Sequence, residues 1–268
     1  MAITALHSAA SGLRALSTQI DVVSNNLANA ETTAFKGSRV NFQDLVYQEL
    51  RQPGTANAQG DIAPSGIFVG LGTRVDNTQI DLTQGSLQNT NRDLDVAIQG
   101  NGFFAIQMMK SLGNGTGYTR SGNFFINNKN ELVLGIGEGY RLIPPINVPT
   151  GTTAINIGQD GTLQVKQPNG TLRTIGQLQL TQFVNPQGLQ LLGGSIYQET
   201  QASGPPITTT PGVQGAGLIE QGFLEQSNVD PVTELVTLIK TQRAFEMNSQ
   251  SIQTADQALQ TVANLRRG

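Results

Sequence analysis

The sequence contains no cysteine and no tryptophan, and His7 is its single histidine. Without cysteine there can be no disulfide, no thiolate nucleophile and no cysteine-ligated metal. With one histidine, neither a zinc site nor a Ser-His-acid triad is expected. The sequence therefore predicts a protein that is not an enzyme and uses no cofactor or metal, and in which His7 is a surface or subunit-contact residue.

Charge is scarce as well. Charged residues make up 13% of the chain, about half of the ~25% usual in soluble domains. The net charge of -3 gives no electrostatic reason to expect nucleic acid or an anionic membrane as a partner. A surface that is buried against copies of itself needs little charge. The composition therefore fits a self-assembling subunit, and it fits a secreted β protein rich in Ser, Thr, Asn and Gln equally well.

Long apolar runs are also missing. No stretch approaches the ~20 apolar residues of a membrane span. The N-terminus has no basic region followed by an apolar run and a cleavage site, since the first basic residue is Arg14, so no cleavable signal peptide is expected. These features predict a cytoplasmic protein, unless the chain is exported by a route that uses no such signal.

Both ends of the chain show helical periodicity. At the N-terminus, apolar residues recur every seven positions at Leu6, Leu13, Ile20 and Leu27, with Ala9, Leu16, Val23 and Ala30 three positions after each. This pattern predicts a helix over residues 3–31. At the C-terminus the same spacing joins Leu238, Phe245, Ile252 and Leu259, flanked by Leu235 and Val262. Asn228 or Asp230 before Pro231 predicts the start of the second helix.

The two apolar seams predict helices that pair as a coiled coil, although Thr241 and Asn248 interrupt the C-terminal stripe. Few charges flank the seams, and small polar residues cover the other helix faces, which favours packing on several sides. We expect the seam residues to contact both the partner helix and neighbouring subunits. The alternative is an ordinary helical hairpin that closes a monomer.

The region between the helices is rich in turns and short strands. Residues 48–66, which include Arg51, Gln52, Pro53 and Gly54, are polar and predict an extended loop or arm. Alternating apolar residues predict strands at 94–98, 103–106, 162–166 and 177–180, and Asp160-Gly161 and Asn169-Gly170 predict hairpin turns. The expected fold class is α+β, with long terminal helices paired as a coiled coil, an inserted mainly β domain and an extended arm. The expected divisions are 1–45 for the N-terminal helix and its linker, 46–75 for the arm, 76–225 for the β domain and 226–268 for the C-terminal helix.

Two patterns resemble catalytic motifs only superficially. The glycines of residues 135–139 follow a strand-like segment, but Tyr140 and the prolines after it do not open a helix, so a turn is expected and not a dinucleotide site. Asp93 and Asp95 would share one face of a strand, and without other acid–base or metal-binding groups around them they are expected to be solvated.

Three groups of residues resemble the flagellar rod and hook axial protein family. The first comprises Asn25, Asn26, Leu27 and Asn29, followed by Phe35 and Lys36. The second lies near the C-terminus and includes Gln242 and Arg243, and the third covers residues 94–104 and 118–122. Within that family, residues 47–54 and 64–75 resemble the arm of the distal rod member. Ala34 and Asn130 depart from the family pattern, because each stands where a glycine is usual.

The resemblance implies a structural subunit that polymerises into the distal rod, a rigid drive shaft and export channel that transmits torque from the motor to the hook. It implies five kinds of partner: copies of the chain itself, proximal rod proteins below, hook protein above, ring proteins of the peptidoglycan and outer membrane, and the flagellar export apparatus. It places the protein in the basal body, spanning the periplasm, after export without signal cleavage. Hook protein or another axial subunit is the alternative within the family. A secreted enzyme or adhesin with a helical stalk is the alternative from a different class.

Overall fold

The computed structural model describes residues 2–54, 64–109 and 115–265. The chain divides into two compact units: unit 1 holds residues 1–28, 38–79 and 230–268, and unit 2 holds residues 29–37 and 80–229. The chain therefore passes between the units four times, at 28/29, 37/38, 79/80 and 229/230. This grouping differs from the expected divisions, because residues 29–37 lie with the β-rich unit and not with the N-terminal helix.

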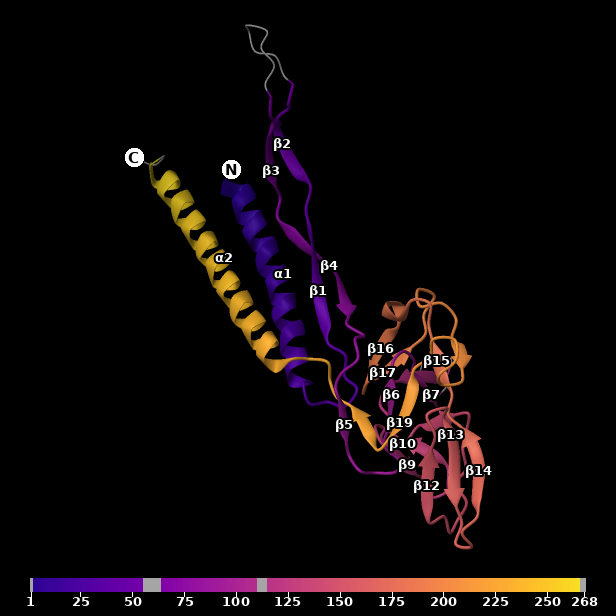
Figure 1. Ribbon diagram of the computed structural model, residues 1–268. Coiled ribbons are helices and arrows are strands. Elements are labelled where there is room, and N and C mark those ends of the chain that lie inside the picture. The colour runs from indigo at the N-terminus through magenta and orange to yellow at the C-terminus, as the bar shows by residue number, and fades with distance from the viewer. Residues whose placement is uncertain (1, 55–63, 110–114, 266–268) are drawn as a thin grey trace. The chain divides into compact units, whose positions relative to one another are not determined.

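Unit 1 contains the two terminal helices, α1 (Ala2–Ala28) and α2 (Pro231–Leu265). They lie side by side and antiparallel, with the two chain ends at the same end of the pair (Figure 1). Asp230 caps α2: its Oδ1 accepts the Val232 N–H at 3.1 Å and its Oδ2 accepts the Thr233 hydroxyl at 2.5 Å. Pro231 occupies the first helical position, where its missing N–H costs nothing, so the predicted helix start is confirmed. Neither helix in the described part of the chain has the length and apolarity that a membrane crossing requires.

The facing sides of the two helices include small and polar side chains. Gly12 lies so close to α2 that a Cβ there would be 3.0 Å from Nδ2 of Asn248. Thr241 is only 4% exposed, and Ala15 and Val23 are buried on α1. Small side chains let the two backbones approach closely, which explains why Thr241 and Asn248, the residues that interrupt the apolar stripe, lie on the inner side.

The remaining elements of unit 1 are two β-hairpin ladders. They are β1 (Ser38–Asp44) with β4 (Thr73–Ile80) and β2 (Tyr47–Arg51) with β3 (Ile67–Gly70). The loop expected over residues 48–66 therefore begins in a strand, since Gln48 pairs with Val69 and Arg51 with Ile67. Residues 55–63 of that predicted arm lie outside the described residues.

Unit 2 is built from short antiparallel strands around one main core. Its elements are β5 (Leu87–Asn89), β6 (Val96–Gln99), β7 (Phe104–Gln107), β8 (Thr116–Thr119), β9 (Phe124–Ile126), β10 (Leu132–Leu134), β11 (Arg141–Ile143), β12 (Ala154–Ile157), β13 (Thr162–Lys166), β14 (Leu172–Gln177), β15 (Leu180–Gln182), η1 (Pro186–Gly188), β16 (Gln190–Gly193), β17 (Ile196–Gln198), β18 (Ile207–Thr209), β19 (Leu218–Gln221) and β20 (Phe223–Glu225). A seven-stranded sheet has the order β16-β17-β8-β7-β11-β10-β9, and a three-stranded sheet has the order β12-β13-β14. The pairs β15-β18, β19-β6 and β20-β5 complete the unit.

The core of unit 2 follows from strand alternation. Leu163 and Val165 of β13 point to the same side and are fully buried, as the predicted strand 162–166 requires. The edge-to-face pair Phe104–Phe124, with ring centroids 5.3 Å apart, lies in the same apolar cluster. A smaller cluster gathers Phe103, Tyr118, Phe183 and Tyr197.

Two sequence expectations for unit 2 are wrong. The single strand expected at 177–180 is interrupted between β14 and β15, because the Leu178 amide turns to donate to Gly161 O at 2.7 Å. Asp95 is not solvated but 1% exposed, and its Oδ1 lies 3.7 Å from Nη1 of Arg92. Asp95 precedes β6 instead of lying in it, so it does not share a strand face with Asp93, which is exposed.

Candidate assembly surfaces

Helix α2 exposes several large apolar residues among its polar ones. Ile239 is 57% exposed, and it belongs to a set of exposed large apolar residues on this helix: Val232, Leu235, Val236, Ile239, Phe245, Met247 and Leu259. Val232, Leu235, Val236 and Ile239 are neighbours on the helix surface by their spacing, and an exposed apolar patch of this kind marks an interaction site in soluble proteins. The helix therefore presents to solvent the residue types that most proteins bury.

The predicted seam residues fall into three groups by burial. Val23 is the one that is buried, and the half-buried group comprises Leu6, Leu13, Leu16, Ile20, Leu27, Leu238 and Ile252. Leu235, Phe245 and Leu259 are exposed, and the side chain of Val262 lies outside the described residues. Part of each seam is thus at least half-buried, and part of the α2 seam is exposed to solvent. Contact of these residues with other subunits stays a prediction.

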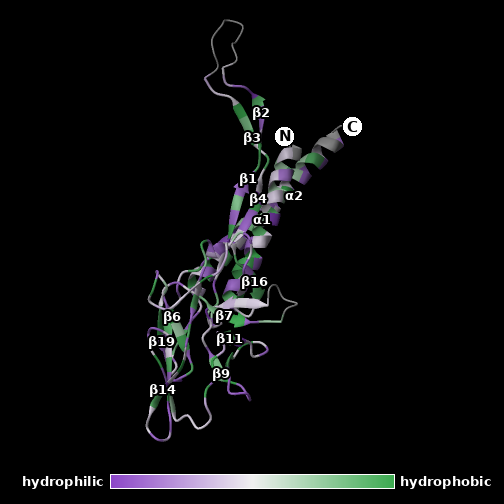
Figure 2. Cartoon of the chain, turned by 90° about the vertical axis from the view of Figure 1, so that its right-hand side faces the viewer, coloured by the Kyte–Doolittle hydropathy of each residue, from purple (hydrophilic) through white to green (hydrophobic). Residues whose placement is uncertain are grey.

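A second exposed apolar surface lies on the β2–β3 hairpin. Phe68 is 54% exposed, and Val46, Tyr47, Leu50 and Ile67 are exposed beside it. Figure 2 shows both strands of this hairpin with apolar, green segments. An uncovered two-stranded hairpin is marginally stable in water. The predicted arm residues continue this surface: Arg51 donates to Ser65 O at 3.2 Å, Gln52 and Pro53 are exposed, and Gly54 has φ = 85°.

The base of the arm is held against α1 by polar contacts within unit 1. Nδ1 of His7 lies 3.2 Å from Leu71 O, and the Ser8 hydroxyl donates to Gly70 O at 3.3 Å. The Thr73 amide donates to Oγ of Ser11 at 3.2 Å. His7 is exposed and contacts the arm, so it has a structural neighbour and no catalytic partner among these contacts.

Asn26 is the motif residue with the clearest structural role in unit 1. Its side-chain amide donates to Ser38 O at 2.8 Å and to Oε1 of Glu234 at 3.2 Å, and its Oδ1 accepts the Ser38 N–H at 3.0 Å. One buried side chain therefore joins α1, β1 and α2. The other motif residues are placed differently: Leu27 and Asn29 are half-buried, and Asn25, Gln242 and Arg243 are exposed.

Lys36 and the half-buried Phe35 close the N-terminal motif in unit 2, where Lys36 enters a buried charge cluster. Its Nζ lies 2.5 Å from Oε1 of Glu225 and 2.6 Å from Thr83 O, and Nε of Arg120 lies 2.7 Å from Oε2 of Glu225. The side chains of Lys36, Glu225 and Arg120 are 0%, 0% and 4% exposed. Burial lowers the pKa of Lys36 below its usual value of 10.5, and the Glu225 carboxylate opposes that shift. Sequence reasoning missed Glu225, because no spacing links it to Lys36.

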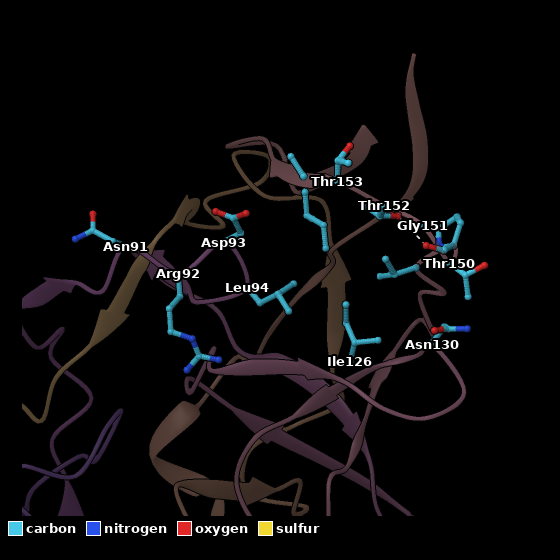
Figure 3. Close-up of a pocket in the computed structure, with 14 residues that line it drawn as sticks. Asn91, Arg92, Asp93, Leu94, Ile126, Asn130, Thr150, Gly151, Thr152 and Thr153 are labelled. Atoms are coloured by element: carbon cyan, nitrogen blue, oxygen red, sulfur yellow. Dashed lines mark hydrogen bonds between the residues drawn. The ribbon is translucent and has the colours of Figure 1, made fainter. Parts of the chain in front are cut away.

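One open pocket of unit 2 is lined by few groups that could bind a metal or take part in catalysis. It has a volume of about 670 Å³, and its walls come from residues 91–94, Ile126, Asn130 and 148–155. Figure 3 shows the Arg92 side chain extending away from the wall of Thr150 to Thr153. The lining has no histidine or cysteine, and the described residues contain no group of three or more potential metal ligands.

Comparisons with known proteins match three segments of the chain. Residues 6–36 match the family described as "Flagella basal body rod protein", residues 97–165 match "Flagellar hook protein FlgE/F/G D1 domain", and residues 220–265 match "Flagellar basal body rod FlgEFG protein C-terminal". The flagellar basal-body rod protein FlgG of Buchnera aphidicola from Schizaphis graminum is 48% identical over 255 residues, which cover 95% of this chain and 96% of the relative. The FlgG proteins of Caulobacter vibrioides and Bacillus subtilis are 41% and 36% identical, covering 98% and 99% of this chain and 99% and 100% of theirs. The chain belongs to the FlgG family of flagellar basal-body rod proteins.

As a FlgG-family chain, it is a structural subunit of the flagellar basal-body rod, and it assembles there with other flagellar components. The resemblance predicted from the sequence is confirmed. The alternative of a hook protein is not favoured, since the full-length relatives are named as rod proteins. Those relatives are named as structural rod proteins and not as enzymes.

Proposed function

We propose that the chain polymerises into the distal rod, where it serves as a rigid drive shaft and a channel for exported subunits. The observation that carries the proposal is the uncovered apolar surface of unit 1, on α2 and on the β2–β3 hairpin. Burial of this surface against further copies would add roughly 1.5–3 kcal/mol per large side chain. The free chain is then an incomplete structure that its neighbours finish.

The terminal helices form the inner tube in this proposal. Their pairing as a coiled coil would use the partly covered seams, while the exposed residues of α2 contact adjacent copies. The inner faces carry Thr241 and Asn248, which allow close approach without strong attraction. The expected divisions at 45, 75 and 225 then correspond to an inner-tube helix pair, an arm and an outer β domain.

The arm gives the rod its stiffness in this proposal. The hairpin exposes Tyr47, Leu50 and Phe68, which would lock it against a neighbouring subunit. Deletion of residues 48–66 should then yield an assembled but bendable tube, seen as curvature in electron micrographs of purified basal bodies. A straight rod from that deletion would count against the stiffening role.

The proposed partners follow from the place of the rod. Proximal rod proteins would contact the chain below, hook protein above, and the rings of the peptidoglycan and outer membrane around it. The chain would reach this position through the flagellar export apparatus, unfolded and without loss of an N-terminal signal. These assignments rest on the family membership and on the low charge of the chain.

Polymerisation can be tested with one charge placed at two positions on α2. Ile239→Asp puts a carboxylate on the exposed apolar surface, and Gln250→Asp puts the same group at an exposed polar position. Ile239→Asp should abolish concentration-dependent polymers of the purified chain in the electron microscope, while Gln250→Asp should leave them intact. Equal polymerisation of the two variants would refute the assembly surface on α2.

A further inference from the structure

The segments that lead into and out of unit 2 are bonded to one another. The Ala34 amide donates to Glu225 O at 2.8 Å, and the Gly37 amide donates to Oδ1 of Asn228 at 2.8 Å. The Asp81 amide donates to Gly37 O at 2.7 Å. Segment 29–37 borders two of the passages between the units, and residues 80–85 and 225–229 border one each. All four passages therefore start from residues that this hydrogen-bond network joins.

Glu225 is the centre of the network. Its backbone carbonyl holds Ala34, and its Oε1 accepts from both Lys36 Nζ and the Gly85 amide, the latter at 3.0 Å. Its Oε2 accepts from Arg120, whose guanidinium also donates to the carbonyls of residues 98, 100 and 102. One carboxylate thus bonds all three bordering segments and the loop after β8.

The cluster has two cations and one anion, all withdrawn from water. Each cation lowers the cost of burying Glu225, but Lys36 and Arg120 repel each other, and Arg120 accordingly opposes the protonated form of Lys36. Without Glu225, two like charges would remain buried with no counter-ion, which the protein relieves by opening that site to water or by releasing the Lys36 proton. Glu225 is therefore the member of the cluster whose loss should be the most disruptive.

We infer that Lys36, Arg120 and Glu225 form an ionic clamp within unit 2, which joins the segments that border the four chain passages into one stiff element, so that load arriving along these passages is shared among them. This inference rests on the proposed function as a drive shaft. A single chain passage is compliant, because each residue contributes two soft backbone torsions. Segments bonded to one buried anion cannot rotate independently, so they share the load. The three residues act as positioning residues and touch no ligand.

The clamp can be tested in the purified full-length chain by hydrogen exchange. Glu225→Gln should raise exchange roughly tenfold or more at the Ala34, Gly37 and Gly85 amides, while amides of β7 and β11 in the central sheet keep their protection. Unchanged exchange at these three amides would overturn the clamp, and so would a uniform rise throughout unit 2, which would reveal a loss of stability only. Lys36→Met should give a smaller local rise, because it leaves the balanced Arg120–Glu225 pair. Lys166→Met, at an exposed lysine, is the matched control.

The mechanical role needs a second readout, namely swimming speed against viscosity in the source bacterium carrying each variant. We expect Glu225→Gln cells to assemble rods, to swim near normally in dilute medium and to slow more steeply than wild type as viscosity rises. Should that variant fail to accumulate, Glu225→Asp, which keeps the charge but shortens the reach, takes its place. Wild-type speed at every viscosity, combined with raised exchange at Ala34, would overturn the mechanical role of the clamp. Normal motility after complete deletion of the chain would instead refute the proposed function, so the two failures are distinguishable.

Discussion

The two units of this chain follow opposite packing rules. Unit 2 buries Phe104, Leu163 and their neighbours completely, as an independent domain does. Unit 1 buries Thr241 and Asn26 between its elements and exposes Ile239 and Phe68. Unit 2 thus buries its large apolar side chains, whereas unit 1 exposes large apolar side chains of the kind that protein interfaces bury. This contrast fits the proposed polymer, in which unit 1 would contact further copies and unit 2 has a complete core of its own.

The largest expected effect contrasts two phenylalanines, one from each unit. Phe104→Ala removes a fully buried ring that contacts Phe124, and it should lower the free energy of unfolding of unit 2 by about 3–5 kcal/mol. Phe68→Ala removes a ring that is mostly exposed in the monomer, and it should change the free energy of unfolding of unit 1 by less than ~0.5 kcal/mol. Urea denaturation of the monomer, followed by circular dichroism, measures both.

The same pair should reverse its ranking in polymerisation. Phe68→Ala should weaken assembly of the purified chain, since Phe68 lies on the proposed contact surface. A Phe68→Ala chain that unfolds as readily as Phe104→Ala would break the comparison, because the hairpin would then belong to a finished core. Ile67→Val, which keeps most of the exposed apolar surface, serves as the mild control on the same strand.

The next effect concerns alkaline pH and the buried tyrosine of β8. Burial, reinforced by the nearby carboxylate of Glu199, raises the pKa of Tyr118 from 10.0 to about 12. The unfolded chain therefore releases this proton first, so the stability that the neutral hydroxyl contributes is present below pH 10 and is lost as the pH rises from about 10 to 12. The loss should reach about 2–3 kcal/mol.

Unfolding free energies at a series of pH values between 9 and 12 check this prediction. Tyr118→Phe should make the decline in that window shallower without abolishing it, because burial also raises the pKa of Tyr197. Tyr47→Phe, at an exposed tyrosine of unit 1, should leave the decline unchanged. An identical decline in the Tyr118→Phe chain would show that another group controls alkaline unfolding of unit 2.

The sequence predicted the elements of this fold better than their contacts. Heptad spacing and the Asp230-Pro231 pair predicted both helices, and alternation predicted β13 at its observed bounds. Periodicity alone could not say which side of α2 faces α1. The two helices approach closely at Gly12, and apolar residues such as Leu235 and Ile239 remain exposed.

The charge cluster of unit 2 was beyond prediction for a different reason. Lys36 and Arg120 are 84 positions apart in the sequence, and Arg120 and Glu225 are 105 positions apart. Their meeting depends on the pairing of β20 with β5 and on the path of segment 29–37, both of which are tertiary features. The family resemblance marked Lys36 and Arg120 as motif residues but gave no reason for their chemistry. Their shared carboxylate supplies that reason.

The smallest expected effect tests one of the two departures from the family pattern. Ala34, in the segment that enters unit 2, is fully buried and has φ = 56°, a conformation that favours glycine. Ala34→Gly relieves roughly 1–2 kcal/mol of left-handed strain. It also loses about 0.8 kcal/mol of methyl burial, and it adds roughly 0.5–1 kcal/mol of unfolded-chain entropy. These effects nearly cancel, so the free energy of unfolding of unit 2 should change by less than ~0.5 kcal/mol, measured by urea denaturation. Asn130→Gly, at φ = 62° on a half-buried turn, loses no buried methyl and should be the more favourable of the two. A loss above ~2 kcal/mol for Ala34→Gly would mean that the methyl group is packed tightly enough to outweigh the strain of its backbone.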